Sequence, residues 1–139
     1  MNIKTLCMIF AVILAAGCLS AQTYDHRLTA NVPFGFMAAE GNFPAGAYEL
    51  YRLQTNLIVV DGGKGQKKAA MATVPRNDQK NRGTAKLVFN KYGETYFLAE
   101  VWDSTEIGHA LPKSRTEKDM ALIAARQASR VTLVASVGR

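Results

Sequence analysis

The stretch KLVFNKYGETYFLAEVW, residues 86–102, decides the fold class of this chain. It contains two runs rich in Val, Phe, Tyr and Leu that are joined by a short turn at Gly93, which is the pattern of a β-hairpin. In the second run, residues 95–102, apolar side chains occupy both sets of alternating positions. Such a strand is buried on both faces, so we expect it in the middle of a sheet.

Further strand patterns lie on both sides of this hairpin. Residues 28–36 alternate strictly between apolar and other side chains, which predicts one strand with a buried face. Pro33 lacks an amide donor, so this strand is expected at a sheet edge or with a bulge. Residues 75–83 are polar and rich in turn formers, and we expect a mobile loop there. The remaining predicted strands are 47–53, 56–61, 67–74 and 131–137. For residues 67–74 a helix is the alternative, because Ala69, Ala70 and Met71 favour one.

One helix is predicted in the C-terminal half. Ser114 and Glu117 have the spacing of a capping box, which places the start of the helix at Arg115 and its end at about Gln127. The apolar face that this helix would bury consists of Met120, Ile123, Ala124 and Ala128. Six or seven short strands with one late helix predict a small antiparallel β-sandwich or barrel.

The first 21 residues have the pattern of a signal peptide. Lys4 supplies a positive start, and residues 5–16 form an uncharged apolar run that is too short for a membrane span, which needs about 20 residues. We therefore expect an exported protein, periplasmic or extracellular. Its mature part, residues 22–139, has the length of a single β-rich domain.

Two processing routes fit the end of the signal segment. Ordinary signal peptidase would cut after Ala21, whereas residues 14–18 resemble a lipobox in which Cys18 is lipidated and anchors the protein to a membrane. The chain has two cysteines, Cys7 and Cys18, and both lie in this segment. The folded domain is therefore expected to lack an internal disulfide.

The positive charge of the chain, +6 in total, is concentrated in its middle. Residues 64–91 contain eight Lys and Arg against one acid, Asp78. Outside the cytoplasm this predicts an anionic partner such as lipid headgroups, lipopolysaccharide phosphates or acidic polysaccharide, and no nucleic acid. The alternative is a set of solvated loops with lysines guarding strand edges. The candidate contact residues are Lys64, Lys67, Lys68, Lys80 and Arg82.

The sequence carries no catalytic signature. Asp103, His109 and Ser114 have the residue types of an acyl-transfer triad, but the nucleophile-elbow pattern is missing and Ser114 is explained as a helix cap. His26 and His109 are far apart and have no cysteine partners, so no metal or other cofactor is predicted. Tyr96 and Trp102 are candidates for the lining of an apolar pocket, with packing in the core as the alternative.

Several motifs occur together in one order along the chain. They are VPFGF at 32–36, FPAGAY at 43–48, LVF at 87–89 followed by YG and YFL, VW at 101–102, and the segment 108–117. In this combination the chain resembles a group of small, signal-bearing, uncharacterised proteins common in Acidobacteria. It departs from that pattern at Phe43, where leucine is expected, and at residues 37–39, where a more polar turn is usual. The resemblance implies an exported β domain and no site residues.

Together these patterns predict a non-enzymatic protein of the cell envelope. In the leading hypothesis, a small β module binds or scaffolds a component outside the cytoplasm, through its basic segment. The alternative is a carrier that holds an apolar small molecule in a cavity of the sandwich or barrel. A filled core with a basic face would favour the binding module, and a pocket lined by aromatic residues would favour the carrier.

Overall fold

The computed structural model describes residues 26–138, so the predicted signal segment and Cys18 lie outside the described residues. The strands are β1 (Leu28–Val32), β2 (Phe36–Ala38), β3 (Gly41–Phe43), β4 (Gly46–Gln54), β5 (Leu57–Asp61), β6 (Lys68–Ala72), β7 (Val74–Asn77), β8 (Lys86–Tyr92), β9 (Thr95–Trp102), β10 (Ile107–Ala110), β11 (Ala128–Val134) and β12 (Ser136–Val137). The helix α2 spans Arg115–Ile123, and two 3₁₀ turns lie at Gln79–Asn81 and Ala125–Gln127.

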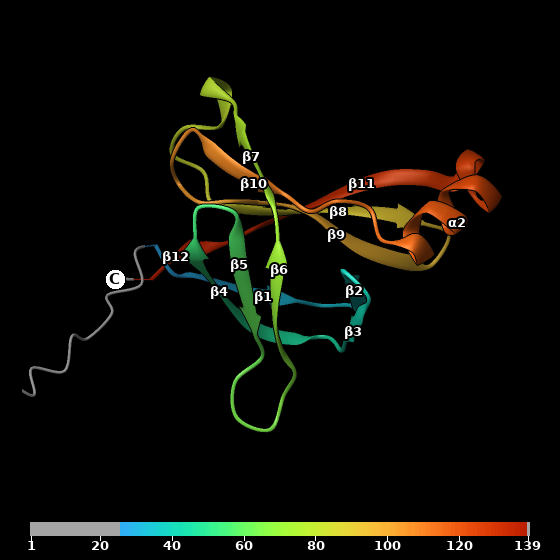
Figure 1. Cartoon of the computed structure of the whole chain (residues 1–139), viewed down its shortest axis with the longest axis horizontal. Helices are drawn as coiled ribbons and strands as arrows, with labels where there is room; N and C mark the ends of the chain where they lie inside the picture. Colours follow the sequence, from blue (N-terminus) through green and yellow to red (C-terminus); the bar gives the residue numbers. More distant parts are fainter. Residues whose placement is uncertain (1–25, 139) are drawn as a thin grey trace, which may run out of the picture.

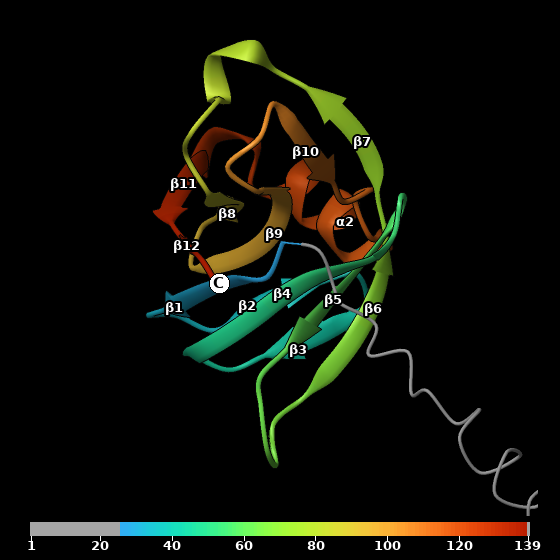
Figure 2. The ribbon, with the colours of Figure 1, turned by 90° about the vertical axis from the view of Figure 1, so that its left-hand side faces the viewer.

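The strands form two sheets that pack face to face (Figures 1 and 2). Sheet A has the order β12-β1-β4-β5-β6, and sheet B has the order β11-β8-β9-β10-β7. The short hairpin of β2 and β3 joins sheet B, where β2 pairs with β9. The prediction of a mainly β, sandwich-like fold with one helix is confirmed, and the sheets do not close into a barrel. The predicted hairpin at residues 86–102 is also confirmed, with β9 central in its sheet.

The chain passes between the sheets four times, from β1 to β2, from β3 to β4, from β6 to β7 and from β11 to β12. Three of these crossings divide a predicted strand, which is one reason why there are more strands than predicted. The chain leaves sheet A after β6 and enters sheet B as β7, and it leaves sheet B after β11 and enters sheet A as β12. Thr73 and Ala135 lie at these crossings, both buried. The predicted loop at residues 75–83 was therefore wrong in part, because residues 74–77 pair with β10. The predicted strand 131–137 is likewise divided between the two sheets.

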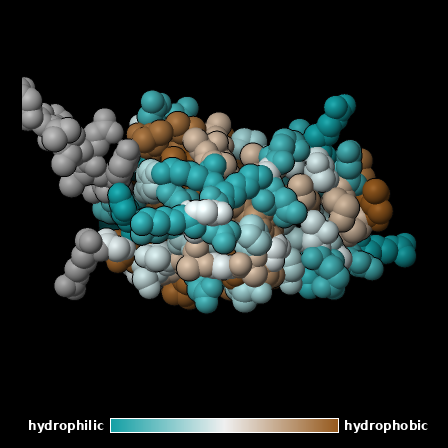
Figure 3. All heavy atoms as spheres, turned by 90° about the horizontal axis from the view of Figure 1, so that it is seen from below, coloured by the Kyte–Doolittle hydropathy of each residue, from teal (hydrophilic) through white to brown (hydrophobic). Residues whose placement is uncertain are grey.

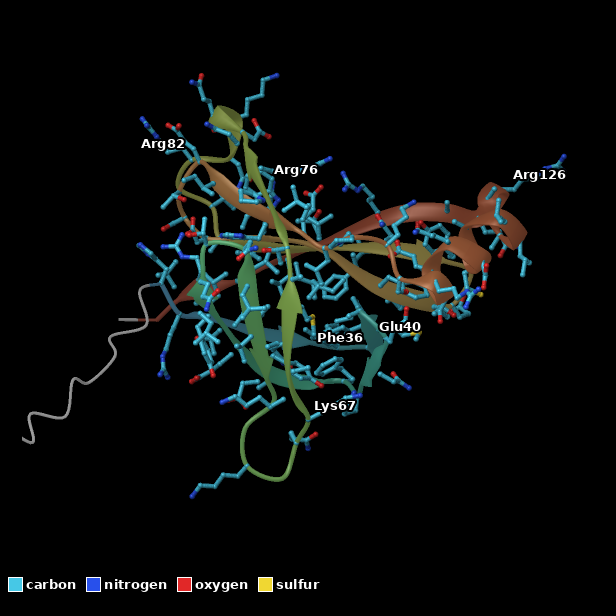
Figure 4. All side chains as sticks on the ribbon, viewed as in Figure 1. Phe36, Glu40, Lys67, Arg76, Arg82 and Arg126 are labelled. Carbon is cyan, nitrogen blue, oxygen red and sulfur yellow. The ribbon has the colours of Figure 1, made fainter. Side chains whose placement is uncertain are left out.

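Aromatic side chains fill the space between the sheets. The predicted strand 28–36 breaks after Val32, because Pro33 cannot donate to a ladder, and the chain then turns Phe36 into the core (Figure 4). The Phe36 ring centroid lies 5.3 Å from that of Phe43 and 5.4 Å from that of Phe89. Full burial of such a side chain contributes roughly 1.5–3 kcal/mol. Packing of this kind stabilises the domain without a crosslink among the described residues.

A β-bulge in β9 decides which side chains face outward. The register changes from Val88 opposite Glu100 to Phe89 opposite Leu98, so β9 contains one additional residue at this point. Leu98 and Val101 consequently both face the core between the sheets. Glu100 and Trp102 lie on the other side of sheet B, which we call its outer face.

Helix α2 begins where the capping box predicts, but it ends at Ile123 instead of about Gln127. Of the predicted apolar face, Met120 and Ala124 are half-buried, while Ile123 and Ala128 are exposed. The Glu117 amide donates to Ser114 Oγ at 3.1 Å, while the Glu117 carboxylate turns to sheet B and accepts hydrogen bonds from Asn90 at 2.8 Å and Tyr92 at 3.3 Å. Glu117 is thus the buried residue of the helix. Ile123 is 84% exposed, and hydrophobic residues are visible at the α2 end of the molecule (Figure 3). Within residues 26–138, no helix is long and apolar enough to cross a membrane.

Candidate functional site

The five predicted contact residues of the basic segment do not form one surface. Lys64, Lys67 and Lys68 lie at or beside the turn between β5 and β6. Lys80 and Arg82 lie at the 3₁₀ turn between β7 and β8, at the opposite end of the molecule, as the labels of Lys67 and Arg82 show in Figure 4. The crossing from β6 to β7 carries the chain from one end to the other. Residues that are clustered in the sequence are therefore separated in space.

Three of these five residues also have local partners. Lys68 Nζ lies 2.9 Å from Asp61 Oδ2, Arg82 pairs with Glu106, and Lys67 Nζ lies 5.2 Å from the centre of the Phe43 ring. The hydrogen bond between Lys68 and Asp61 lowers the pKa of the carboxyl and raises the pKa of the ammonium. Exposed pairs of this kind contribute about 0–1 kcal/mol each.

A different set of charged residues converges on the outer face of sheet B. Glu100 lies on the central strand β9, and its Oε1 accepts hydrogen bonds from Arg130 Nη2 at 2.8 Å and from Arg76 Nη1 at 3.0 Å. Arg130 comes from β11 and Arg76 from β7, which lie at the two ends of the strand order in sheet B. Each arginine reaches over one intervening strand to the same carboxylate. We call Arg76, Glu100 and Arg130 the arginine clamp.

Trp102 lies beside the clamp on the outer face of sheet B. Its Nε1 donates to the second carboxylate oxygen of Glu100 at 2.9 Å, and its ring lies against Gly108 of β10. A Cβ atom at position 108 would lie only 2.4 Å from the indole ring, so glycine is the residue that lets Trp102 lie across β10. Lys86 Nζ lies 5.7 Å from the centre of the same ring. Glu100 is thereby fixed on three sides by donors.

In the arginine clamp the negative charge, on Glu100, is buried, and the two positive charges, on Arg76 and Arg130, are exposed. The side chain of Glu100 is 9% exposed, whereas those of Arg76 and Arg130 are 58% and 59% exposed. Burial alone would raise the pKa of Glu100, but the hydrogen bonds from Trp102 and Arg130 and the charges of both arginines outweigh it and lower that pKa. One ionised carboxylate neutralises only one of the two guanidinium charges. A guanidinium carries five N–H donors in a fixed plane, so both arginines keep donors for a carboxylate or phosphate in solution.

An open groove continues the clamp towards α2. Its volume is about 340 Å³, and its lining consists of Asn90, Tyr92, Ala128, Ser129 and Arg130. The Tyr92 hydroxyl accepts from Lys113 Nζ at 3.2 Å, which adds a cation close to the groove. The outer face of sheet B therefore presents Arg76, Lys86, Lys113 and Arg130, while the two acids beneath them, Glu100 and Glu117, are buried and accept hydrogen bonds.

A second polar cluster lies at one end of the space between the sheets. Asp103 and His109 line a pocket there that leaves only about 20 Å³ for the centres of water molecules. His109 Nδ1 lies 3.3 Å from Thr73 Oγ1, and Asp103 Oδ1 accepts from the Thr105 amide at 2.7 Å. Burial, followed by the charge of Arg52, lowers the pKa of His109 against the opposing effect of Asp103. Ser114 does not line this pocket and caps α2, so the three triad-type residues are not brought together.

Tyr96 and Trp102 do not share a pocket. Tyr96 packs against the core cluster, where its ring stacks on Phe34 with the centroids 3.8 Å apart. Trp102 lies near the other end of β9, beyond the bulge, on the outer face of the sheet. Their spacing of six positions suggested one shared face, but the additional residue of the bulge reverses the alternation between them.

No protein-family model matches this chain, and neither the curated proteins nor the solved structures contain a match.

The residues of the clamp were only partly visible in the sequence. Arg76 belonged to the basic segment, but Arg130 lies 54 positions further along and was assigned to no site. Glu100 gave one signal, because it is the single acid in the otherwise apolar run of residues 96–102. A charged residue in a central strand needs a partner, since an unpaired buried charge is strongly unfavourable. That rule could have predicted a cationic partner for Glu100, although not which one.

Proposed function

We propose that this chain is a non-enzymatic binding module of the cell envelope, which holds an anionic group of an envelope component on its arginine clamp. The observation that carries the proposal is the pair of half-exposed guanidinium groups fixed by one buried carboxylate. Because Glu100 already orients both arginines, little side-chain entropy remains to be lost when an anion binds. A phosphate or carboxylate would accept hydrogen bonds from Arg76 and Arg130, with Lys86 and Lys113 adding attraction at longer range.

Export is part of the same proposal and is supported by the signal-like first 21 residues. Outside the cytoplasm the available anions are lipid phosphates, lipopolysaccharide phosphates and the carboxylates of acidic polysaccharide. All three fit the chemistry of the clamp. A protein lipidated at Cys18 would present the clamp near a membrane, and a protein cut after Ala21 would present it in solution.

The alternative, a carrier of an apolar molecule, has less support. The pocket between the sheets leaves about 20 Å³, which is room for one or two water molecules. A dry cavity that binds benzene has a volume of roughly 150 Å³. The aromatic side chains that the carrier hypothesis assigns to a pocket pack instead in the core or beneath the clamp.

Binding of the mature domain, residues 22–139, to lipopolysaccharide and to vesicles containing phosphatidylglycerol tests the proposal. The clamp variant R76Q/E100Q/R130Q removes the site without leaving a buried carboxylate unpaired. The control variant K64Q/K80Q removes two charges elsewhere, which lowers the net charge more than the clamp variant does. Thermal melts of both variants establish that they are folded.

We expect the clamp variant to bind at least about tenfold more weakly, since a hydrogen bond to a charged group contributes about 1.5–3 kcal/mol. The control variant should lose less than about twofold, and binding of the parent should fall with added salt because exposed charges are screened over about 10 Å at 0.1 M. An equal or larger loss in the control variant would show that only net charge matters. Unchanged binding by the clamp variant would also contradict the proposal.

A further inference from the structure

Strand β11 has an edge with no partner in the described part of the chain. Its seven residues, Ala128–Val134, pair with β8 on one side, and no other strand of residues 26–138 pairs with the opposite side. In an antiparallel strand, alternate residues direct their N–H and C=O groups away from the existing partner. Such an edge is a template on which another strand can add.

This edge lacks most of the features that normally prevent strand addition. Residues 128–134 contain no proline or lysine, and their pairing with β8 runs without a bulge from Ala128 to Val134. The other edges are different: β7 contains Pro75, β6 contains Lys68, β12 has two residues and β3 has three. The one charged residue of β11, Arg130, is directed to Glu100 across the sheet. Of the five edges, β11 is thus the one suited to pairing.

We propose that β11 pairs antiparallel with β11 of a second copy of this chain, with Val131 on the two-fold axis. This register pairs all seven residues and places no like charges directly opposite each other, which would be destabilising. Shifting the axis by one residue to Arg130 would set two arginines face to face. In the proposed register the opposed pairs are Val131 with Val131, Arg130 with Thr132, Ser129 with Leu133, and Ala128 with Val134.

The apolar side chains of β11 that would become buried in the dimer also favour this register. Val134 is 78% exposed in the single chain and would contact Ala128 of the second copy. Val131 and Leu133 are half-buried and pack against the core cluster, and the pairing would cover their remaining exposed surface. A β-branched residue at the axis is favourable, because such side chains pack well across paired strands.

The dimer would also join two clamps. A two-fold axis perpendicular to the sheet keeps both outer faces on one side, so the two copies of Arg130 become diagonal neighbours about 7–8 Å apart. If the clamp binds anions, as proposed above, a polyanion that contacts both clamps would favour the dimer. By reciprocity, dimerisation would then raise the affinity for that polyanion by the same factor.

A cysteine at the axis tests the register directly, because residues 22–139 contain no cysteine. With Val131→Cys, the opposed Cα atoms would be about 4.5–5.5 Å apart, within the range that a disulfide spans. Val134→Cys is the matched control, since it lies on the same strand and is more exposed, yet its two copies would be about 20 Å apart. Mild oxidation followed by non-reducing electrophoresis measures the crosslink, and light scattering gives the mass of the parent domain.

We expect a covalent dimer of Val131→Cys, little of Val134→Cys, and a parent mass twice that of one chain. A mixture of Ala128→Cys and Val134→Cys should crosslink between the two variants, which checks the register if Val131→Cys does not fold. A monomeric parent at about 100 µM, or crosslinking of Val134→Cys as fast as that of Val131→Cys, would overturn the proposal. No anionic ligand is present in these measurements, so their failure is distinguishable from failure of the clamp to bind anions.

Discussion

Replacing Glu100 should destabilise the domain. The loss depends on whether the new side chain can accept a hydrogen bond from the Trp102 indole N–H. Glu100→Ala removes the acceptor of a buried N–H, and an unsatisfied buried donor costs about 1–3 kcal/mol. The two arginines add little to this loss, because their side chains are 58% and 59% exposed and can be hydrated. Glu100→Gln keeps an acceptor for the indole and is expected to cost only about 1 kcal/mol. Urea unfolding of both variants beside the parent measures the difference.

The pH dependence of stability separates the effect of the Glu100 charge from the effect of its side-chain shape. Because the pKa of Glu100 is lowered in the folded state, its stabilising effect is fully present above its ordinary value of 4.5 and is lost as the pH falls through the folded value. The Glu100→Gln variant has no ionisable side chain at this position. The stability difference between parent and Glu100→Gln should therefore shrink below about pH 4.5. A difference that is absent at pH 7, or that is constant from pH 7 to pH 3, would refute this reasoning.

Three further predictions concern stability. Ser114→Ala should cost about 1 kcal/mol in urea melts, because it removes the side-chain acceptor of the Glu117 amide; an unchanged midpoint would contradict the cap. Gly108→Ala should cost about 1–3 kcal/mol and change Trp102 fluorescence, since its Cβ would collide with the indole; an unperturbed spectrum and melt would argue against that packing. The pKa of His109 is lowered in the folded state, so the parent should lose stability as the pH falls below 6.5 towards the folded pKa. His109→Gln should lose less stability over this range, and parallel pH profiles of the two proteins would contradict the prediction.

Local patterns in the sequence predicted those parts of the fold that are themselves local. The hairpin at residues 86–102, the strand at Gly46–Gln54 and the start of α2 at Ser114 depend on alternation, turn residues and a cap, all within a few positions. The crossing at Thr73 left no comparable signal, because a strand that changes sheets looks locally like one strand. The bulge in β9 was also invisible, since register depends on the partner strand.

The candidate site shows the same division more sharply. The lysines and arginines of the basic segment are close together in the sequence, but the fold places Lys67 and Arg82 far apart. The clamp joins strands β7, β9 and β11, and only the order of the strands in sheet B brings Arg76 and Arg130 to Glu100. The helix was predicted to end at about Gln127 and to bury Ile123, whereas α2 ends at Ile123 and leaves this side chain 84% exposed. The predicted face was wrong for an energetic reason, because hydrogen bonds from Asn90 and Tyr92 hold the Glu117 side of the helix against sheet B.

The indole N–H signal of Trp102 offers the most direct test of anion binding at the clamp. The chain contains one tryptophan, so one indole resonance reports on the site, and that N–H donates to Glu100. We expect titration of the mature domain with a short-chain phosphatidylglycerol, below its micelle concentration, to shift this resonance and saturate. The same titration of Lys64→Gln/Lys80→Gln should give the same shift. Binding that leaves the indole resonance unmoved, while backbone amides near Lys64 or Lys80 shift, would contradict the account.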